Sequence, residues 1–246
     1  KQKNVLITGA SRGIGRAIAT RLTHDGYRVI NLDKLAPPSL LKDEEFHQID
    51  ITDSDALKTL LQEIMHRTKV LRLVNNAGIQ HTANIEDFPA DKWDAIIAIN
   101  LSSVFHTTHH ALPGMKKRNW GRIINIASVH GLVASTQKAA YVAAKHGIVG
   151  LTKVIALENA HTGITCNAIC PGWVLTPLVQ KQVDARAERE GISNEAAKTA
   201  LVSEKQPSGE FVSPEQLGAL AIFLCSQDAS EVRGAAWNMD GGWAAQ

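Results

Sequence analysis

A glycine-rich turn between a short apolar strand and an amphipathic helix is the feature of this sequence that most restricts its fold. The apolar residues 5–7 run into Thr-Gly-Ala-Ser-Arg-Gly-Ile-Gly at residues 8–15, and Ile14, Ile18 and Leu22 then repeat with helical spacing. A strand, a glycine-rich turn and a helix N-terminus together present backbone amides to a pyrophosphate. The pattern therefore predicts a doubly wound α/β fold that binds a dinucleotide.

The turn itself supplies the candidate phosphate-binding residues. Its glycines lack a Cβ, so that backbone and ligand can approach closely. Residues 9–13 also match Gly-x-Ser-x-Gly, the nucleophile elbow of hydrolases, but a third glycine and a first-strand position favour nucleotide binding. The candidates are Gly9, Ser11, Arg12, Gly13, Ile14 and Gly15.

Asp33 is the residue expected to choose between NAD and NADP. It follows the predicted strand 28–32, where an acid can accept hydrogen bonds from a ribose 2′-hydroxyl and repel a 2′-phosphate. Arg12 and Lys34 are cations that favour a 2′-phosphate instead. We give the carboxylate more weight, because an unpaired carboxylate facing a phosphate is unfavourable, and we expect NAD.

Strand and helix patterns alternate along all 246 residues. Strands are predicted near 4–8, 28–32, 46–49, 71–74, 121–127, 163–170 and 235–239, and helices near 13–25, 53–67, 91–117, 138–160 and 214–226. The alternation predicts one domain, residues 1–246, with a seven-stranded parallel sheet covered by helices on both faces. Residues 177–209 interrupt it, and we expect one or two polar helices there that form a substrate lid.

Composition argues against several other classes of protein. The formal net charge of +2 gives no case for nucleic acid, and the 3 cysteines predict neither a disulfide framework nor a zinc site. No signal peptide and no apolar stretch long enough to span a membrane is expected. We therefore predict a cytoplasmic protein without metal, nucleic-acid or membrane partners.

A second constellation, in the middle of the chain, predicts proton transfer. Tyr141 and Lys145 are four residues apart and share one face of a predicted helix. A neighbouring ammonium would lower the pKa of the phenol, which could then exchange protons with an alcohol or a ketone. Ser128 stands upstream, after the apolar run 123–127. The Tyr-x-x-x-Lys spacing alone is common, and an ordinary helix face is its alternative.

Taken together, these motifs resemble the short-chain dehydrogenase/reductase family over essentially the whole chain. They are the turn at 8–15, Asn-Asn-Ala-Gly at 75–78, Asn100, Ser128, Tyr141 with Lys145, and Pro171-Gly172, all in family order. The resemblance implies a Rossmann-type fold, a nicotinamide cofactor and usually a homotetramer. Helices 91–117 and 138–160, apolar on more than one side, are the expected subunit interface.

The resemblance also implies a role for each residue of a catalytic tetrad. Ser128 would hold the substrate oxygen, and Tyr141 would be the general base or acid. Lys145 would lower the pKa of the tyrosine and hold the nicotinamide ribose, while Asn100, at a helix kink, would bind a proton-relaying water. Further cofactor contacts are implied for Asp50, Ile51, Asn76, Ala77, Gly78, Pro171, Gly172, Val174 and Thr176.

Polar residues in the expected pocket narrow the substrate. A lysine, two amides and a histidine could hold a small carboxylate by charge-assisted hydrogen bonds, and two tryptophans could wall its apolar end. These residues are Gln80, His130, Lys138, Gln182, Trp173 and Trp243. For each alone, exposed loop or cap chemistry is the alternative.

The segments 77–81, 126–135, 170–177 and 234–243 resemble bacterial D-3-hydroxybutyrate dehydrogenases. That resemblance implies NAD-dependent interconversion of (R)-3-hydroxybutyrate and acetoacetate, as in ketone body metabolism. Another reductase of the same family is the first alternative, for example a 3-oxoacyl carrier-protein reductase or a polyol dehydrogenase. A non-catalytic NAD-binding protein is the second.

Overall fold

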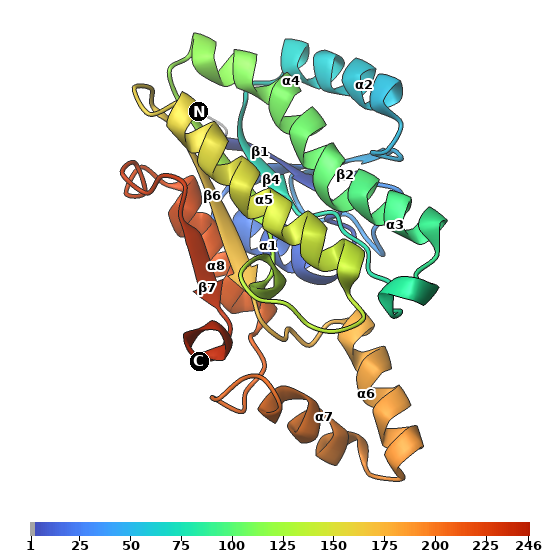
Figure 1. The fold of residues 1–246 in the computed structure, drawn as a ribbon. Helices are drawn as coiled ribbons and strands as arrows, with labels where there is room; N and C mark the ends of the chain where they lie inside the picture. Colours follow the sequence, from blue (N-terminus) through green and yellow to red (C-terminus); the bar gives the residue numbers. More distant parts are fainter. Residues whose placement is uncertain (1–2) are drawn as a thin grey trace.

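The computed structural model describes residues 3–246 and is built around a parallel sheet of seven strands (Figure 1). The strands lie in the order β3-β2-β1-β4-β5-β6-β7. They are β1 Lys3–Thr8, β2 Tyr27–Asp33, β3 Glu44–Gln48, β4 Val70–Asn75, β5 Gly121–Ile126, β6 Ile164–Pro171 and β7 Ala236–Met239. The chain order reverses beside β1, so a ligand crevice is expected at the carboxyl ends of β1 and β4. The predicted fold class is confirmed.

Helices cover both faces of the sheet because its strands are apolar on both sides. In β1, Val5 and Ile7 pack with the core under α1 and α8, whereas Leu6 packs with the core under α2, α4 and α5. The helices are α1 Gly13–His24, α2 Ser54–Arg67, α3 Ala90–Ile97, α4 Ser103–Lys117, α5 Ala139–Glu158, α6 Pro177–Glu190, α7 Asn194–Ser203 and α8 Pro214–Cys225.

The predicted helix 91–117 is interrupted. A π-helical turn, Ala98–Ser102, separates α3 from α4, and the buried Asn100 lies inside it. The Asn100 side chain accepts from the amide of Ile79 at 2.8 Å and donates to its carbonyl at 2.9 Å. A π turn changes the regular helical hydrogen-bond ladder, and such turns are frequent at functional sites. The interruption of the helix at Asn100 is therefore a π turn.

Helix α5 is long and apolar enough, by length and composition alone, to cross a membrane, contrary to the expectation from sequence. Ile148 and Ile155 of this helix nonetheless join the core beneath the sheet. A buried core helix passes the same test, so this finding is weak evidence for a membrane span.

Two helix starts lie where the sequence predicted them. Asp53 is the N-cap of α2, and Pro214 is the first residue of α8.

Two polar helices, α6 and α7, project from the body beyond the carboxyl end of β6 (Figure 1). Thr176 caps α6, and the two helices pack through a small cluster of Val183, Ala187 and Ala197. Arg186 of α6 also pairs with Glu204 at 2.6 Å. The expected pair of polar helices is thus confirmed, and it stands at the edge of the sheet where ligands bind.

Candidate active site

The glycine-rich turn is pressed against the end of β4. Gly9 has a φ of +70°, and a Cβ on it would lie 2.9 Å from the Cα of Ala77. A Cβ on Gly15 would overlap the carbonyl oxygen of Gly9 and the side chain of Asn76. Helix α1 starts at Gly13, so its free amides face the space above the turn. Only glycine fits at Gly9 and Gly15. The turn and the free amides at the start of α1 together suit a pyrophosphate.

Hydrogen bonds fasten the end of β4 to this turn. The amides of Asn76 and Ala77 both donate to the hydroxyl of Thr8, at 3.0 and 3.1 Å. The Asn76 side chain donates to the carbonyl of Gly9 at 2.9 Å. Gly78, next along, faces the Asn100 side chain, to whose Oδ1 an added Cβ would approach within 3.5 Å. The cofactor candidates 76–78 therefore join the glycine turn to the π turn.

The two acids expected at the adenosine end are held differently. Asp33 accepts from the amide of Ser11 at 3.0 Å and from that of Leu35 at 3.1 Å. Asp50 pairs instead with Lys34 at 2.7 Å, and this hydrogen bond, with those from Thr52, lowers its pKa to about 2. Lys34, one of the cations that favoured NADP, is thus already paired with a carboxylate.

Three of the four tetrad candidates, Ser128, Tyr141 and Lys145, lie together at the carboxyl end of β5, whereas the side chain of Asn100 is bonded to Ile79. Ser128 follows that strand, Tyr141 and Lys145 lie on α5, and Asn100 lies on the π turn. Lys145 is buried and its Nζ donates to the carbonyl of Ile126 at 2.8 Å. The same Nζ lies 5.5 Å from the centroid of the Tyr141 ring.

One expectation for the tetrad is wrong in this structure. Burial raises the pKa of the Tyr141 phenol above its ordinary value, and only a hydrogen bond with Ser128 opposes this. Burial also lowers the pKa of Lys145 to about 8. A buried ammonium that donates to a backbone carbonyl does less for the phenolate than the spacing on a helix suggested.

A cavity of about 120 Å³ opens beside Tyr141. Its walls include all eight residues expected to bind substrate, together with five of the expected cofactor residues. The substrate group is Gln80, Ser128, His130, Lys138, Tyr141, Trp173, Gln182 and Trp243, and the cofactor group is Ile14, Pro171, Gly172, Val174 and Thr176. The structure thus brings both groups to one site.

The side chains that line the cavity include a half-buried lysine and two residues with unpaired donors. Burial lowers the pKa of Lys138, whose Nζ lies 5.1 Å from the centroid of the Trp173 ring. Within the described residues, neither Nε2 of Gln80 nor Nε1 of Trp173 has a hydrogen-bond partner, although both are buried. A buried unpaired donor is unfavourable, so these groups suit a ligand rich in acceptor oxygens.

His130 connects the cavity to the tetrad. Burial and the nearby Lys138 lower its pKa to about 3, so the imidazole is neutral at neutral pH. Its Nε2 lies 2.9 Å from the hydroxyl of Ser135 and its Nδ1 lies 3.4 Å from that of Ser128. The ring stands edge-on to Trp243 at 5.3 Å.

Gln206 was not singled out from the sequence. This fully buried amide, just beyond α7, accepts from the amide of Trp173 and donates to the carbonyl of Glu210 at 2.6 Å. A Cβ on Gly172 would overlap it. Gln206 therefore ties the end of the polar helices to the turn that carries Trp173. Nothing distinguishes it in the sequence, because it stands in a polar segment that resembles solvated surface.

Comparison with known proteins gives a consistent picture. The short chain dehydrogenase family model matches residues 3–187. A D-beta-hydroxybutyrate dehydrogenase of Cupriavidus necator is 58% identical over 99% of this chain and 98% of its own. That of Rhizobium meliloti is 46% identical over 99% of both chains. Among solved structures, ligand-free aldohexose dehydrogenase of Thermoplasma acidophilum has a TM-score of 0.92 at 33% identity, covering 100% of this chain and 95% of its own.

Proposed function

Because this chain belongs to the short-chain dehydrogenase family, we propose that it is an NAD-dependent enzyme that interconverts (R)-3-hydroxybutyrate and acetoacetate. The observation that carries the choice of substrate is the cavity beside Tyr141, which Lys138 lines together with Gln80 and Trp173, two residues whose buried donors have no partner among the described residues. A small carboxylate would pair with all three. Two relatives similar over their full length, named as dehydrogenases of this hydroxy acid, support the same assignment.

The chain's own groups would move the proton. A bound nicotinamide would supply hydride transfer to and from the carbon that carries the hydroxyl. Tyr141 would take the hydroxyl proton during oxidation and return it during reduction. Ser128 would donate a hydrogen bond to the substrate oxygen, and the Lys145 ammonium would stabilise the phenolate once it forms.

The proposed preference for NAD rests on the adenosine end. One amide of the glycine turn and that of Leu35 hold the Asp33 carboxylate in place, so a 2′-phosphate there would meet a fixed negative charge. The ion pair of Lys34 with Asp50 engages one cation that could have offset that charge. Arg12 remains exposed at the start of α1 and is the residue that opposes the assignment.

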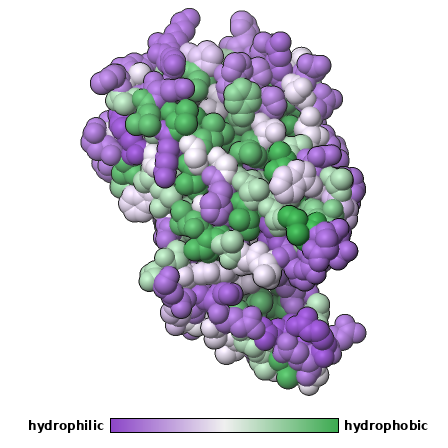
Figure 2. Space-filling view, in the orientation of Figure 1, coloured by the Kyte–Doolittle hydropathy of each residue, from purple (hydrophilic) through white to green (hydrophobic). Residues whose placement is uncertain are grey.

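We also propose that residues 177–209 are a lid on a single domain and that the enzyme is a homotetramer. The exposed fractions of Phe105, Val154 and Leu157 on α4 and α5 are 51%, 50% and 75%, high for large apolar side chains. Figure 2 shows hydrophobic residues gathered over this side of the body, whereas the projecting helices are largely hydrophilic. An apolar helix pair exposed to water suits a two-fold interface. A monomer mass by light scattering would refute the tetramer.

The direct test is NADH formation from NAD and (R)-3-hydroxybutyrate. The (S) enantiomer and NADP are run alongside, and cofactor binding is measured separately by fluorescence. Turnover of the (R) form with NAD supports both the substrate and the cofactor. Protein that binds NADH but turns over neither enantiomer contradicts the substrate, and polyols and oxoacyl thioesters would be tried next.

A further inference from the structure

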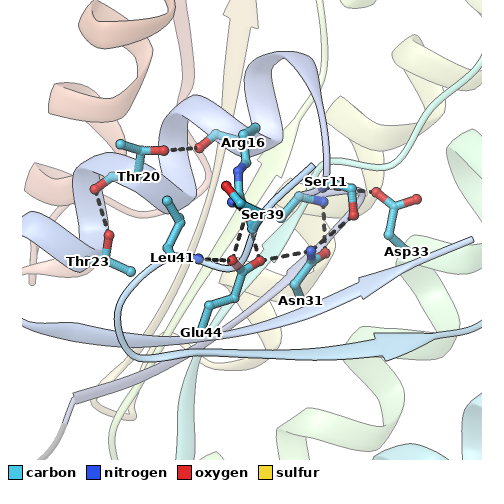
Figure 3. Close-up of polar contacts among 10 residues, drawn as sticks. Ser11, Arg16, Thr20, Thr23, Asn31, Asp33, Ser39, Leu41 and Glu44 are labelled. Atoms are coloured by element: carbon cyan, nitrogen blue, oxygen red, sulfur yellow. Dashed lines mark hydrogen bonds and ion pairs between the residues drawn. The ribbon is translucent and has the colours of Figure 1, made fainter. Parts of the chain in front are cut away.

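Glu44, the first residue of β3, is a buried carboxylate that joins three segments of the chain (Figure 3). The exposed fraction of its side chain is 0%. Both of its oxygens accept from Nη1 of Arg16 at 2.8 Å, and one also accepts from the amide of Leu41 at 2.8 Å. The other accepts from the Asn31 side chain at 3.0 Å. Charge-assisted bonds of this kind are strong and geometrically demanding.

Asn31 carries this contact into the glycine turn. Its side-chain oxygen accepts from the amide of Ala10 at 3.1 Å, and its nitrogen donates to the hydroxyl of Ser11 at 3.1 Å. Both Asn31 and Ser11 are buried. The amide of Ser11 in turn donates to Asp33 at 3.0 Å. A continuous path of hydrogen bonds therefore leads from Glu44 to one oxygen of Asp33.

A second path reaches the other oxygen of Asp33 through the loop 34–43. Arg16, clamped by Glu44, donates to the carbonyl of Ser39, and the amide of Leu41 donates to Glu44 itself. Both contacts hold the far end of the loop. At its near end, the amide of Leu35 donates to Asp33 at 3.1 Å. The two amides that orient Asp33 thus lie on segments that Glu44 holds in place.

We propose that Glu44 is a positioning residue for recognition of the cofactor's adenosine half. By fixing the glycine turn and the loop 34–43 together, it sets the direction of the Asp33 carboxylate and so sharpens the choice of NAD over NADP. The inference rests on the proposed function, since it takes Asp33 as the group that meets the ribose. Beyond that function, Glu44 explains why the Asp33 carboxylate has its orientation.

Glu45, the next residue of β3, gives a matched control. Side chains alternate across a strand, so Glu45 points to the opposite face from Glu44. It pairs with Arg28 at 2.7 Å and with Arg67, and its hydrogen bond from Arg67 lowers its pKa to about 2. Glu45→Gln therefore removes the same charge, from the same strand, and also breaks ion pairs. It differs in leaving the path to Asp33 intact.

The experiment measures the Kd of NADH and of NADPH by fluorescence for the wild type, Glu44→Gln and Glu45→Gln. Glu44→Gln is expected to raise the Kd of NADH about tenfold and to reduce the preference for NADH severalfold. Glu45→Gln is expected to change both by less than about twofold, since it leaves the hydrogen bonds that lead to Asp33 in place. The kcat at saturating NAD should change little in either variant, as neither side chain reaches the cavity.

Equal Kd values in wild type and Glu44→Gln, or equal shifts in the two variants, would overturn the proposal. If Glu44→Gln does not fold, Asn31→Ala tests the same path, because it leaves the pair of Glu44 with Arg16 in place. Asn31→Ala should also raise the Kd of NADH more than the Kd of NADPH. The test needs no turnover, so a wrong substrate does not affect it. A wild type that prefers NADPH would instead contradict the proposed cofactor.

Discussion

The two ends of the ligand crevice satisfy their polar groups in different ways. At the adenosine end, Ser11, Asn31 and Glu44 bond to one another and to the backbone within the chain. At the substrate end, Gln80 and Trp173 keep buried donors that have no partner in the part of the chain that the structure describes. The adenosine end is therefore preformed, and it selects by shape and charge. The substrate end carries a desolvation cost that only a ligand with acceptors removes.

The largest effect is expected from Tyr141→Phe, which tests whether the substrate end is catalytic at all. Loss of the proton donor and acceptor should lower kcat by about 10²- to 10⁴-fold, with the Kd of NADH unchanged. The measurement is steady-state NADH formation together with fluorescence titration. Tyr27→Phe is the control, because Tyr27 is the chain's other tyrosine and is buried in the core. Retained turnover in Tyr141→Phe would remove Tyr141 from the mechanism.

Lys138→Met tests whether the unpaired donors and the ammonium act on a carboxylate. The KM of the hydroxy acid is expected to rise about 100-fold, because a charge-assisted contact is lost from a half-buried site. The Kd of NADH should stay the same, since Lys138 is assigned to the substrate and its Nζ lies against the ring of Trp173. Lys181→Met, on exposed α6, is the control. If the KM of an uncharged alcohol rose as much as the KM of the hydroxy acid, the result would contradict a carboxylate-binding site.

His130→Gln sharpens the comparison through pH. The folded-state pKa of about 3 lies below the ordinary 6.5, so the unfolded chain binds this proton more readily. The stabilising contribution is complete above pH 6.5 and falls by about 1.4 kcal/mol per pH unit as the pH drops toward 3. Denaturant unfolding at pH 7 and pH 5 should show a smaller difference for His130→Gln than for wild type. His161 is exposed, so His161→Gln should behave as wild type. The same pH response in wild type and both variants would exclude His130 as the source of the pH dependence.

The smallest effect is expected from Gln206→Ala, which loosens the link between the polar helices and Trp173. Loss of the acceptor for the Trp173 amide should raise the KM of the hydroxy acid by about tenfold, while the Kd of NADH changes little. Gln180→Ala, on α6 and bonded to Asp184, is the control. If Gln206→Ala and Gln180→Ala had the same KM, the link from the polar helices to Trp173 would have no role in substrate binding.

Much of the fold could be predicted because its signals are local. The glycine turn, the apolar strands, the cap at Asp53 and the first-turn proline Pro214 depend on neighbours in sequence, and each lies where it was expected. The convergence of Ser128, Tyr141 and the pocket residues could be expected because parallel strands end at one edge of a sheet. Local pattern alone predicted one helix over 91–117; only the family resemblance implied the interruption at Asn100, because that side chain bonds to Ile79, 21 positions earlier.

The sequence by itself determined the family, the sheet and the list of residues around the crevice, since motif spacing places them at the ends of particular strands. Only the tertiary structure decided their electrostatics and their supports. Burial reversed the expected direction of the Tyr141 pKa, and it made His130 neutral. Glu44 and Gln206 appear as ordinary polar residues in the chain and gain their roles through distant contacts. Desolvation and hydrogen bonding depend on everything that packs around a group, which spacing along one chain does not encode.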